Sequence, residues 1–98
     1  MKYIMMEKED RVSRVITRLP IIFADAIVHY NMAQMARHHT MLGIDWKVDS
    51  AGFYCPIRQI CHGKSESLNI ESKPARDRLI ILNLEYTKGI EGGLELFT

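Results

Sequence analysis

The residues that could do chemistry in this chain are its histidines, serines, cysteines and acids, and few of them stand at the spacing of a catalytic motif. Asp25 and His29 are four residues apart, so on a helix they would share one face and could form a hydrogen bond. A carboxylate that orients an imidazole is half of a general-base arrangement. The alternative is a surface or interface pair without a chemical role.

A second arrangement would use a serine as the nucleophile. Ser50, Ser65 and Ser67 flank His62 in the sequence, and that histidine could act as the base with Asp49 to orient it. The sequence has no G-x-S-x-G nucleophile elbow, however, and serines beside glycines and turns are common for backbone reasons alone. The result is a candidate polar site without an assigned reaction, made of Asp25, His29, His62, Ser65 and Ser67.

The two cysteines could bind a metal ion together with histidines. Cys55, Cys61 and His62 would need His38 or His39 as a further ligand. Zinc ligands usually come as close pairs such as Cys-x2-Cys, whereas five residues separate these cysteines and no second pair exists. We therefore expect two free thiols on a hairpin, no metal site and no cofactor.

The run Gly63-Lys64-Ser65 resembles the end of a phosphate-binding P-loop. That loop requires a glycine five residues before its second glycine, and Arg58 occupies this position. The strand-to-helix context of a P-loop is also missing here. Nucleotide hydrolysis by this run is therefore excluded.

The one patterned charge is a basic row near the N-terminus. Val12, Val15, Ile16 and Leu19 have the spacing of a buried helical face, which predicts a helix that ends or kinks at Pro20. The high β-branched content leaves a strand as the alternative. The opposite side of that helix would be basic and could track the phosphates of a nucleic acid. The candidate nucleic-acid-binding residues are Lys8, Arg11, Arg14 and Arg18.

The element expected to position most of the polar residues is a hairpin within 46–70. Alternating side chains and aromatic residues predict its first strand, and Gly52 within that strand predicts a bulge or the close approach of another backbone. Pro56–Gln59 would form the loop, and Ile60–His62 would return antiparallel before a break near Gly63. In this pairing the two cysteines point to opposite faces, so we expect no disulfide.

Helices are expected on both sides of this hairpin in the sequence. The longest would cover Ile22–His38, with Gly43 as its exit, and its first half is apolar nearly all the way round. Ser72-Lys73-Pro74 followed by Asp77 predicts a second helix start, from a capping hydroxyl, an early proline and an early acid. Residues 79–86 fit both a helical and an alternating period, and the start signal favours the helix.

The two ends of the chain carry shorter signals. The apolar run Lys2–Met6 fits an edge strand or the lead-in to a helix. Near the other end, Gly92-Gly93 predicts a turn followed by a short strand over Leu94–Phe97.

Size and composition predict a single domain over residues 1–98. A hydrophobic fraction of 47% fits a folded protein, and a net charge of +1 points to no particular charged partner. We find no apolar run long enough to span a bilayer and no signal-peptide pattern, so the expected location is the cytoplasm and no membrane is expected as partner.

These observations favour an α+β fold, with an antiparallel sheet built around the 46–70 hairpin and two or three helices packed on one face. The expected function is that of a small non-enzymatic binding or accessory protein that acts through protein–protein contacts as a homodimer. The reason is the helix around Ile27, which has more apolar surface than one small core needs, together with six methionines suited to adaptable contacts.

Two other functions stay open at this point. One is a nucleic-acid-binding regulator that uses the Arg11, Arg14 and Arg18 face, and the other is a small hydrolase with a histidine-centred site. The run SAGFY…HGKSESLNIESKP is similar to small uncharacterised phage or prophage proteins, a resemblance that implies no activity.

Overall fold

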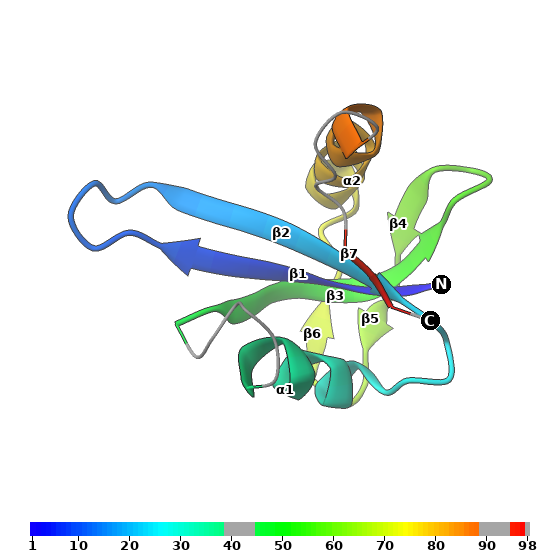
Figure 1. The fold of residues 1–98 in the computed structure, drawn as a ribbon. Coiled ribbons are helices and arrows are strands. Elements are labelled where there is room, and N and C mark those ends of the chain that lie inside the picture. The colour runs from blue at the N-terminus through cyan, green and yellow to red at the C-terminus, as the bar shows by residue number, and fades with distance from the viewer. Residues whose placement is uncertain (39–44, 89–94, 98) are drawn as a thin grey trace.

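Nine strands and helices form the part of the chain that the computed structural model describes, which is residues 1–38, 45–88 and 95–97. In chain order they are β1 Lys2–Glu9, β2 Ile16–Phe23, α1 His29–His38, β3 Lys47–Cys55, β4 Ile60–His62, β5 Lys64–Ser65, β6 Ile70–Glu71, α2 Pro74–Lys88 and β7 Glu95–Phe97. The main sheet has the order β4-β3-β1-β2-β7 and is antiparallel except between β2 and β7 (Figure 1). Strands β5 and β6 pair separately. The α+β class is as expected.

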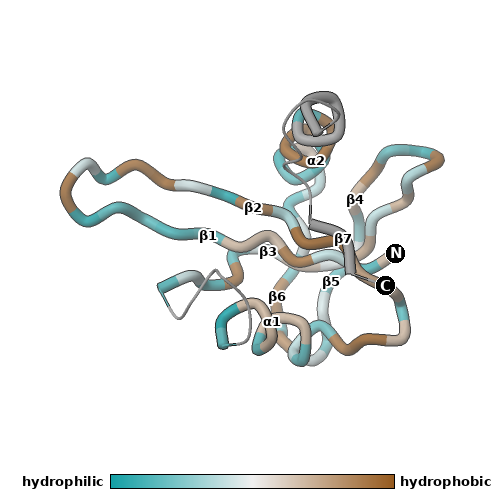
Figure 2. Tube along the Cα trace, in the orientation of Figure 1, coloured by the Kyte–Doolittle hydropathy of each residue, from teal (hydrophilic) through white to brown (hydrophobic). Residues whose placement is uncertain are grey.

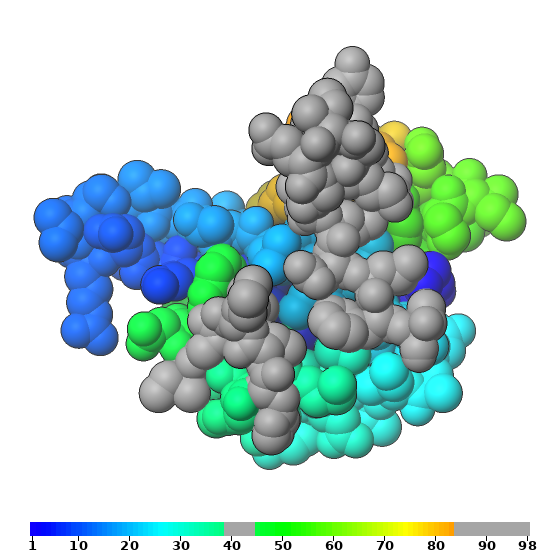
Figure 3. Space-filling model, viewed as in Figure 1, coloured from blue at the N-terminus to red at the C-terminus, as the bar shows by residue number. Residues whose placement is uncertain are grey.

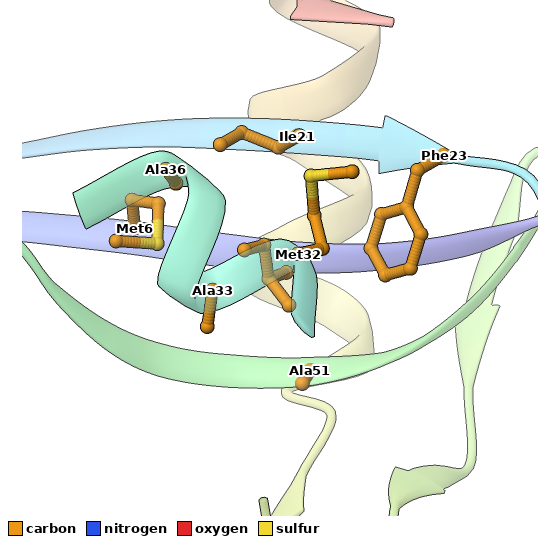
Figure 4. Close-up of a cluster of buried hydrophobic side chains, with 8 residues drawn as sticks. Met6, Ile21, Phe23, Met32, Ala33, Ala36 and Ala51 are labelled. Carbon is orange, nitrogen blue, oxygen red and sulfur yellow. The ribbon is translucent and has the colours of Figure 1, made fainter. Parts of the chain in front are cut away.

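The two helices cover opposite faces of the main sheet, so the prediction that the helices pack on one face is wrong (Figure 1). The cause lies in β1, where Tyr3 to Met6 are all buried and successive side chains point to opposite faces. Both faces therefore need a cover. The α1-side cluster contains Ile4, Met6, Ile21, Phe23, Met32, Ala33, Ala36 and Ala51 (Figure 4). The α2-side cluster contains Tyr3, Met5, Ile22, Tyr54, Cys61 and Ile81.

The N-terminal segment is a hairpin and not a helix. The predicted helix over Val12–Leu19 is wrong, because Ile16–Phe23 pairs along its whole length with β1. The β-branched residues of this segment favour the extended form. The run Lys2–Met6, expected at an edge or before a helix, lies in the central strand of the main sheet. Pro20 lies inside β2 opposite Met5 and ends no helix.

The turn of this hairpin is organised by one acid. The Asp10 carboxylate accepts hydrogen bonds from the N–H groups of Val12 and Ser13, both at 2.9 Å. Arg14 closes the turn with a φ of 64° and donates its N–H to the Asp10 carbonyl at 2.8 Å. Short polar side chains commonly hold turns in this way. The two backbone N–H bonds lower the pKa of Asp10.

Helix α1 is shorter than predicted. The helix expected over Ile22–His38 begins only at His29, because Ile22 and Phe23 pair with both β1 and β7 in the sheet. Tertiary pairing outweighs the local apolar period here. Gly43, the expected exit of this helix, lies outside the described residues.

The hairpin predicted within 46–70 is present in part, because β3 and β4 pair around its loop, but it forms one side of the main sheet and not its centre. Tyr54 pairs with Cys61 and Cys55 pairs with Ile60, as the four-residue loop requires. The cysteines therefore lie on opposite faces, and both are free. The second strand stops at Gly63, which has a φ of 76°.

Gly52 is confirmed as a point of close backbone approach. A Cβ at this position would lie 2.5 Å from the carbonyl oxygen of His62. The bulge that Gly52 could have marked occurs instead where the β1–β3 pairing shifts between Met5 and Met6.

Helix α2 begins where the sequence predicted, with Pro74 as its first residue. The Asp77 N–H donates to the Lys73 carbonyl at 2.8 Å, and the Asp77 carboxylate accepts from the Lys73 N–H at 3.1 Å. Asp77 thus closes the first turn from inside the helix. Residues 79–86 are helical, and a strand over Glu95–Phe97 is present near its predicted position. The predicted turn at Gly92-Gly93 lies outside the described residues.

Candidate functional site

The predicted pairing of Asp25 with His29 is wrong. Asp25 lies in a turn before α1, its side chain is 73% exposed, and it is 3.6 Å from the N-terminal ammonium group. The expected helical spacing fails because the helix has not yet begun at Asp25. Asp25 therefore cannot orient His29 through a shared helix face.

His29 is buried against two aromatic rings. Its ring meets the rings of Phe23 and Phe53 edge-on, with centroid distances of 5.5 and 5.7 Å. The Nε2 atom lies 2.8 Å from the carbonyl oxygen of Gly52, which can only accept, so Nε2 carries the proton. Burial lowers the pKa of His29, the Gly52 bond opposes this, and the nearby Lys2 ammonium lowers it further. The imidazole is therefore held in its neutral form.

A pocket of about 420 Å³ opens beside His29, between the start of α1 and the β5–β6 hairpin. It brings His29 together with Ser67, whereas His62 stacks on Phe53 with a centroid distance of 5.8 Å. Asp25 does not line it. The lining residues are Lys2, Val28, His29, Phe53, Lys64, Glu66 and Ser67.

Ser65 and Ser67, the two predicted serines of this region, accept hydrogen bonds from backbone N–H groups. Ser67 Oγ accepts the N–H of Tyr30 in the first turn of α1 at 3.0 Å, which caps that helix from outside. Ser65 is buried, accepts the N–H of Leu68 at 3.1 Å, and lies 3.4 Å from Ser67 Oγ. Among the described residues no hydrogen bond joins either serine to a histidine.

The serine arrangement that would use Ser50 and Asp49 with His62 is also not assembled. Asp49 lies 2.5 Å from the Arg76 guanidinium and 2.9 Å from Lys73 Nζ. Burial alone would raise its pKa, but hydrogen bonds from these two cations lower the pKa of Asp49 to about 2. Ser50 donates to Asp77 and not to a histidine.

A buried polar cluster around Asp77 is the largest network of side chains in the described structure that the sequence did not reveal. The Asp77 carboxylate is fully buried and accepts the hydroxyls of Tyr3 at 2.5 Å and Ser50 at 2.6 Å. Arg76 donates to the other oxygen at 3.0 and 3.1 Å and also to Ser50. The early acid of α2 was visible in the sequence, but it was interpreted only as a helix-start signal.

The centre of this Asp77 cluster, formed by Asp77, Tyr3 and Ser50, is fully buried, whereas the Arg76 side chain is 28% exposed. Burial, and then the Asp77 carboxylate, raise the pKa of Tyr3 well above its usual value. The same two causes raise the pKa of the Cys61 thiol to about 11. Burial alone would lower the pKa of Arg76, but its bonds to Asp49 and Asp77 raise it. The Tyr3 hydroxyl and the Cys61 thiol therefore stay protonated, and neither is a reactive nucleophile.

The proposed metal ligands do not converge. Cys61 is buried on the α2 side, Cys55 lies on the opposite face of the hairpin, and His62 stacks on Phe53. His38 ends α1, and His39 lies outside the described residues. In residues 1–38, 45–88 and 95–97 no cluster of three or more histidine, cysteine or acidic side chains is placed to hold an ion.

The basic row lies on the β1–β2 ribbon and not on a helix. Lys8 is in β1, Arg11 and Arg14 are in the turn, and Arg18 is in β2. Arg14 pairs with Glu9 at 3.5 Å, and Arg18 pairs with Glu7 at 3.4 Å. The row is therefore interleaved with acids. Residues 7–18 contain four basic and three acidic side chains, so this surface is close to neutral.

The outer part of this ribbon, residues 8–18, projects beyond the rest of the sheet, and we call it the ribbon tip (Figure 3). Strand β3 accompanies β1 only as far as Glu7, so no third strand supports the tip on that side. Three of its apolar side chains are exposed, Val12 at 95%, Val15 at 59% and Ile16 at 43%. The tube of Figure 2 shows hydrophobic stretches between hydrophilic ones along this part of the chain.

Neither helix in the described part of the chain has the length and apolar character needed to cross a bilayer. Comparison of the chain with protein-family models, with curated proteins and with solved structures found no match in any of the three.

Proposed function

We propose that this chain is a non-enzymatic binding protein that recognises a protein partner with its ribbon tip. The observation that carries the proposal is the exposure of Val12, Val15 and Ile16 on an element that projects from the sheet. Single exposed apolar residues are common, but here the adjacent Val15 and Ile16 point to opposite faces of the ribbon and flank its unpaired backbone edge, an arrangement suited to strand recognition.

The burial and the hydrogen bonds of the polar residues support a function without catalysis. Asp77, Tyr3 and Ser50 are fully buried, and the serines near His29 accept hydrogen bonds from backbone N–H groups. A general base must lie within hydrogen-bond reach of the proton that it removes. His29 uses its proton on the Gly52 carbonyl and has no hydroxyl bonded to it in the described structure.

The charge on the ribbon tip favours a protein over a nucleic acid. Nucleic-acid affinity comes largely from basic groups that are free to neutralise phosphates. Here Arg14 and Arg18 each face a carboxylate of the neighbouring strand. Residues 8–18 have four basic and two acidic side chains, and two of the basic ones are already paired with carboxylates of β1. A surface that combines such ion pairs with apolar side chains matches the polar-and-apolar mixture of protein interfaces.

Site-specific photo-cross-linking tests the proposal. A photoreactive residue replaces Val12, and in a matched variant it replaces Ile57, which is 92% exposed at the turn of the β3–β4 hairpin. After irradiation in the cells that express the protein, we expect a discrete protein adduct from position 12 and none from position 57. Equal labelling at both positions, or nucleic acid as the adduct from position 12, would contradict the proposal.

A further inference from the structure

The backbone of β2 leaves a short and well-defined set of hydrogen-bonding groups on its outer edge. The Asp10 N–H donates to the Val15 carbonyl at 2.9 Å, in line with the β1–β2 register. Hydrogen-bonded pairs alternate along an antiparallel ladder, so every second residue of β2 bonds to β1. The residues between them, Ile16, Arg18 and Pro20, turn their backbone polar groups away from β1.

Strand β7 covers only one end of this edge. It pairs with Ile21–Phe23, and no other strand of the described residues pairs with β2 on this side. Pro20 has no N–H to offer, which is how edge strands accommodate proline. Ile16 and Arg18 therefore present two N–H and two C=O groups, a ready template for one more strand.

From this geometry we infer that the occupant is the β2 edge of a second copy of the chain, antiparallel, with the two-fold axis at Thr17. In this alignment Ile16 of each copy lies opposite Arg18 of the other. The N–H and C=O groups of Ile16 and Arg18 in each copy are then bonded across the axis, and each patch faces itself as a two-fold interface requires. The inference rests on the proposed function, because it identifies the partner of the same ribbon tip.

The competing alignments are excluded by charge and by β7. Centring the pair on Ile16 places Arg18 opposite Arg14, which is like-charged and has left the strand with its φ of 64°. Centring it on Arg18 places the two Arg18 side chains opposite each other. It also places Val15 opposite Ile21, where β7 already lies. Like charges directly opposite destabilise a strand pair.

The side chains fit the alignment centred on Thr17. On the α1 face, the exposed Val15 of each copy meets the half-buried Leu19 of the other. The two Thr17 side chains face each other at the axis, a pairing that favours adjacent strands. Strand pairing ends at Val15 opposite Leu19, just before β7 begins opposite Ile21. The exposed Val15 and the unpaired edge are thereby covered together, whereas Val12 lies beyond the paired segment.

Variants with a single introduced cysteine test directly how the two β2 strands are aligned in the dimer. In a Cys55→Ser background, Thr17→Cys places the new thiol against its own copy at the axis, where the Cα–Cα distance is about 4.5 Å and a disulfide can form. Ile16→Cys and Arg18→Cys report the two excluded alignments. We expect a covalent dimer under mild oxidation for Thr17→Cys and at least tenfold less for the other two. Cross-linking that is strongest at position 16 or 18 overturns the inference.

A second measurement separates this inference from the proposed function. Sedimentation of the wild-type chain should show a monomer–dimer equilibrium that depends on concentration. Ile16→Pro removes an outward N–H, as Pro20 already does in the same strand, whereas Ile16→Ala removes only side-chain contacts. With both variants folded by circular dichroism, the proline variant should dimerise at least tenfold more weakly than the alanine variant. A wild-type monomer, or equal dimerisation of the two variants, overturns the inference, while a different protein captured at position 12 would leave the proposed function intact.

Discussion

Replacement of Asp77 by alanine tests the main energetic claim about the fold, which is that one buried carboxylate holds the α2 side together. The substitution removes the acceptor of the Tyr3 and Ser50 hydroxyls and of the Lys73 N–H. Arg76 keeps Asp49 as a partner. Two fully buried hydroxyls and the backbone N–H of the exposed Lys73 then lose their acceptor.

The expected cost follows from these lost partners. A buried donor left without an acceptor costs about 1–3 kcal/mol, whereas Arg76 is partly exposed and keeps Asp49, so no unpaired buried charge is left. Because the three donors share one acceptor and their costs overlap, we expect Asp77→Ala to lower the free energy of unfolding by about 3–5 kcal/mol. For a domain of this length that corresponds to a fall in Tm of about 12–40 °C.

Urea unfolding followed by circular dichroism measures this change. Tyr3→Phe removes one of the donors that Asp77→Ala strands, so the double variant should be more stable than the sum of the single losses predicts. We expect a coupling free energy of about 0.5–3 kcal/mol. Asp25→Ala, at an exposed acid, is the control and should change the free energy of unfolding by less than about 0.5 kcal/mol. A loss below about 1 kcal/mol for Asp77→Ala, additive with Tyr3→Phe, would refute the reasoning.

Four further outcomes follow from the same contacts. Gly52→Ala should lower the free energy of unfolding by at least about 2 kcal/mol, because its Cβ would lie 2.5 Å from the His62 carbonyl oxygen; an unchanged Tm would contradict this. Cys61, with its pKa raised from 9.0 to about 11, should react slowly with Ellman's reagent at pH 8 until urea unfolds the chain, and its contribution to stability should be lost as pH rises from about 9 to 11. Because the pKa of His29 is lowered below 6.5, its contribution is present above that pH and lost as pH falls below it, and an NMR titration of the ring with a midpoint above 6.5 would be inconsistent. The pKa of Asp49 is lowered from 3.8 to about 2, so the free energy of unfolding of the wild type should fall as the pH is lowered between these values. In urea unfolding measured at a series of pH values, Asp49→Asn should lose less stability over the same range.

Three predictions that depended on local chemistry are confirmed, whereas the one at Pro20, which was expected to end a helix, is wrong. The hairpin around the Pro56–Gln59 loop, the start of α2 at Pro74 and the close approach at Gly52 each follow from what proline, glycine or a short acid does to its own backbone. Such constraints act within a few residues, so the sequence displays them directly. They also placed the two cysteines correctly on opposite faces.

The predictions that depended on apolar periodicity failed at two places. Val12 to Leu19 matched a helical face, yet three of these side chains are exposed and the segment pairs with β1. Ile22 and Phe23 looked like a helix start but complete β2. For Ile22 and Phe23 the reason is that a strand buried on both faces is apolar without alternation, so the period cannot distinguish it from a buried helix.

The candidate site was predictable only in part. His29 and Ser67 do line one pocket, but Asp25 does not, because the turn before α1 breaks the assumed helical spacing. The Asp77 cluster joins residues 74 positions apart in the sequence, as Tyr3 and Asp77 show. No local pattern carries information over that separation, and only the sheet order brings these two side chains together.

Strand β1 has four consecutive residues, Tyr3 to Met6, that are fully buried against two apolar layers. A shift of one residue in the register of a strand is normally unfavourable, because it would move the apolar side chains from the buried face to the solvent-exposed face. This constraint on the register is absent in β1, because both of its faces pack against apolar clusters in which methionine or isoleucine can be buried. The tyrosine hydroxyl supplies it instead, because a slipped strand would carry this hydroxyl away from Asp77 and into the layer beneath α1. The hydrogen bond from Tyr3 to Asp77 thus determines the register of the whole strand.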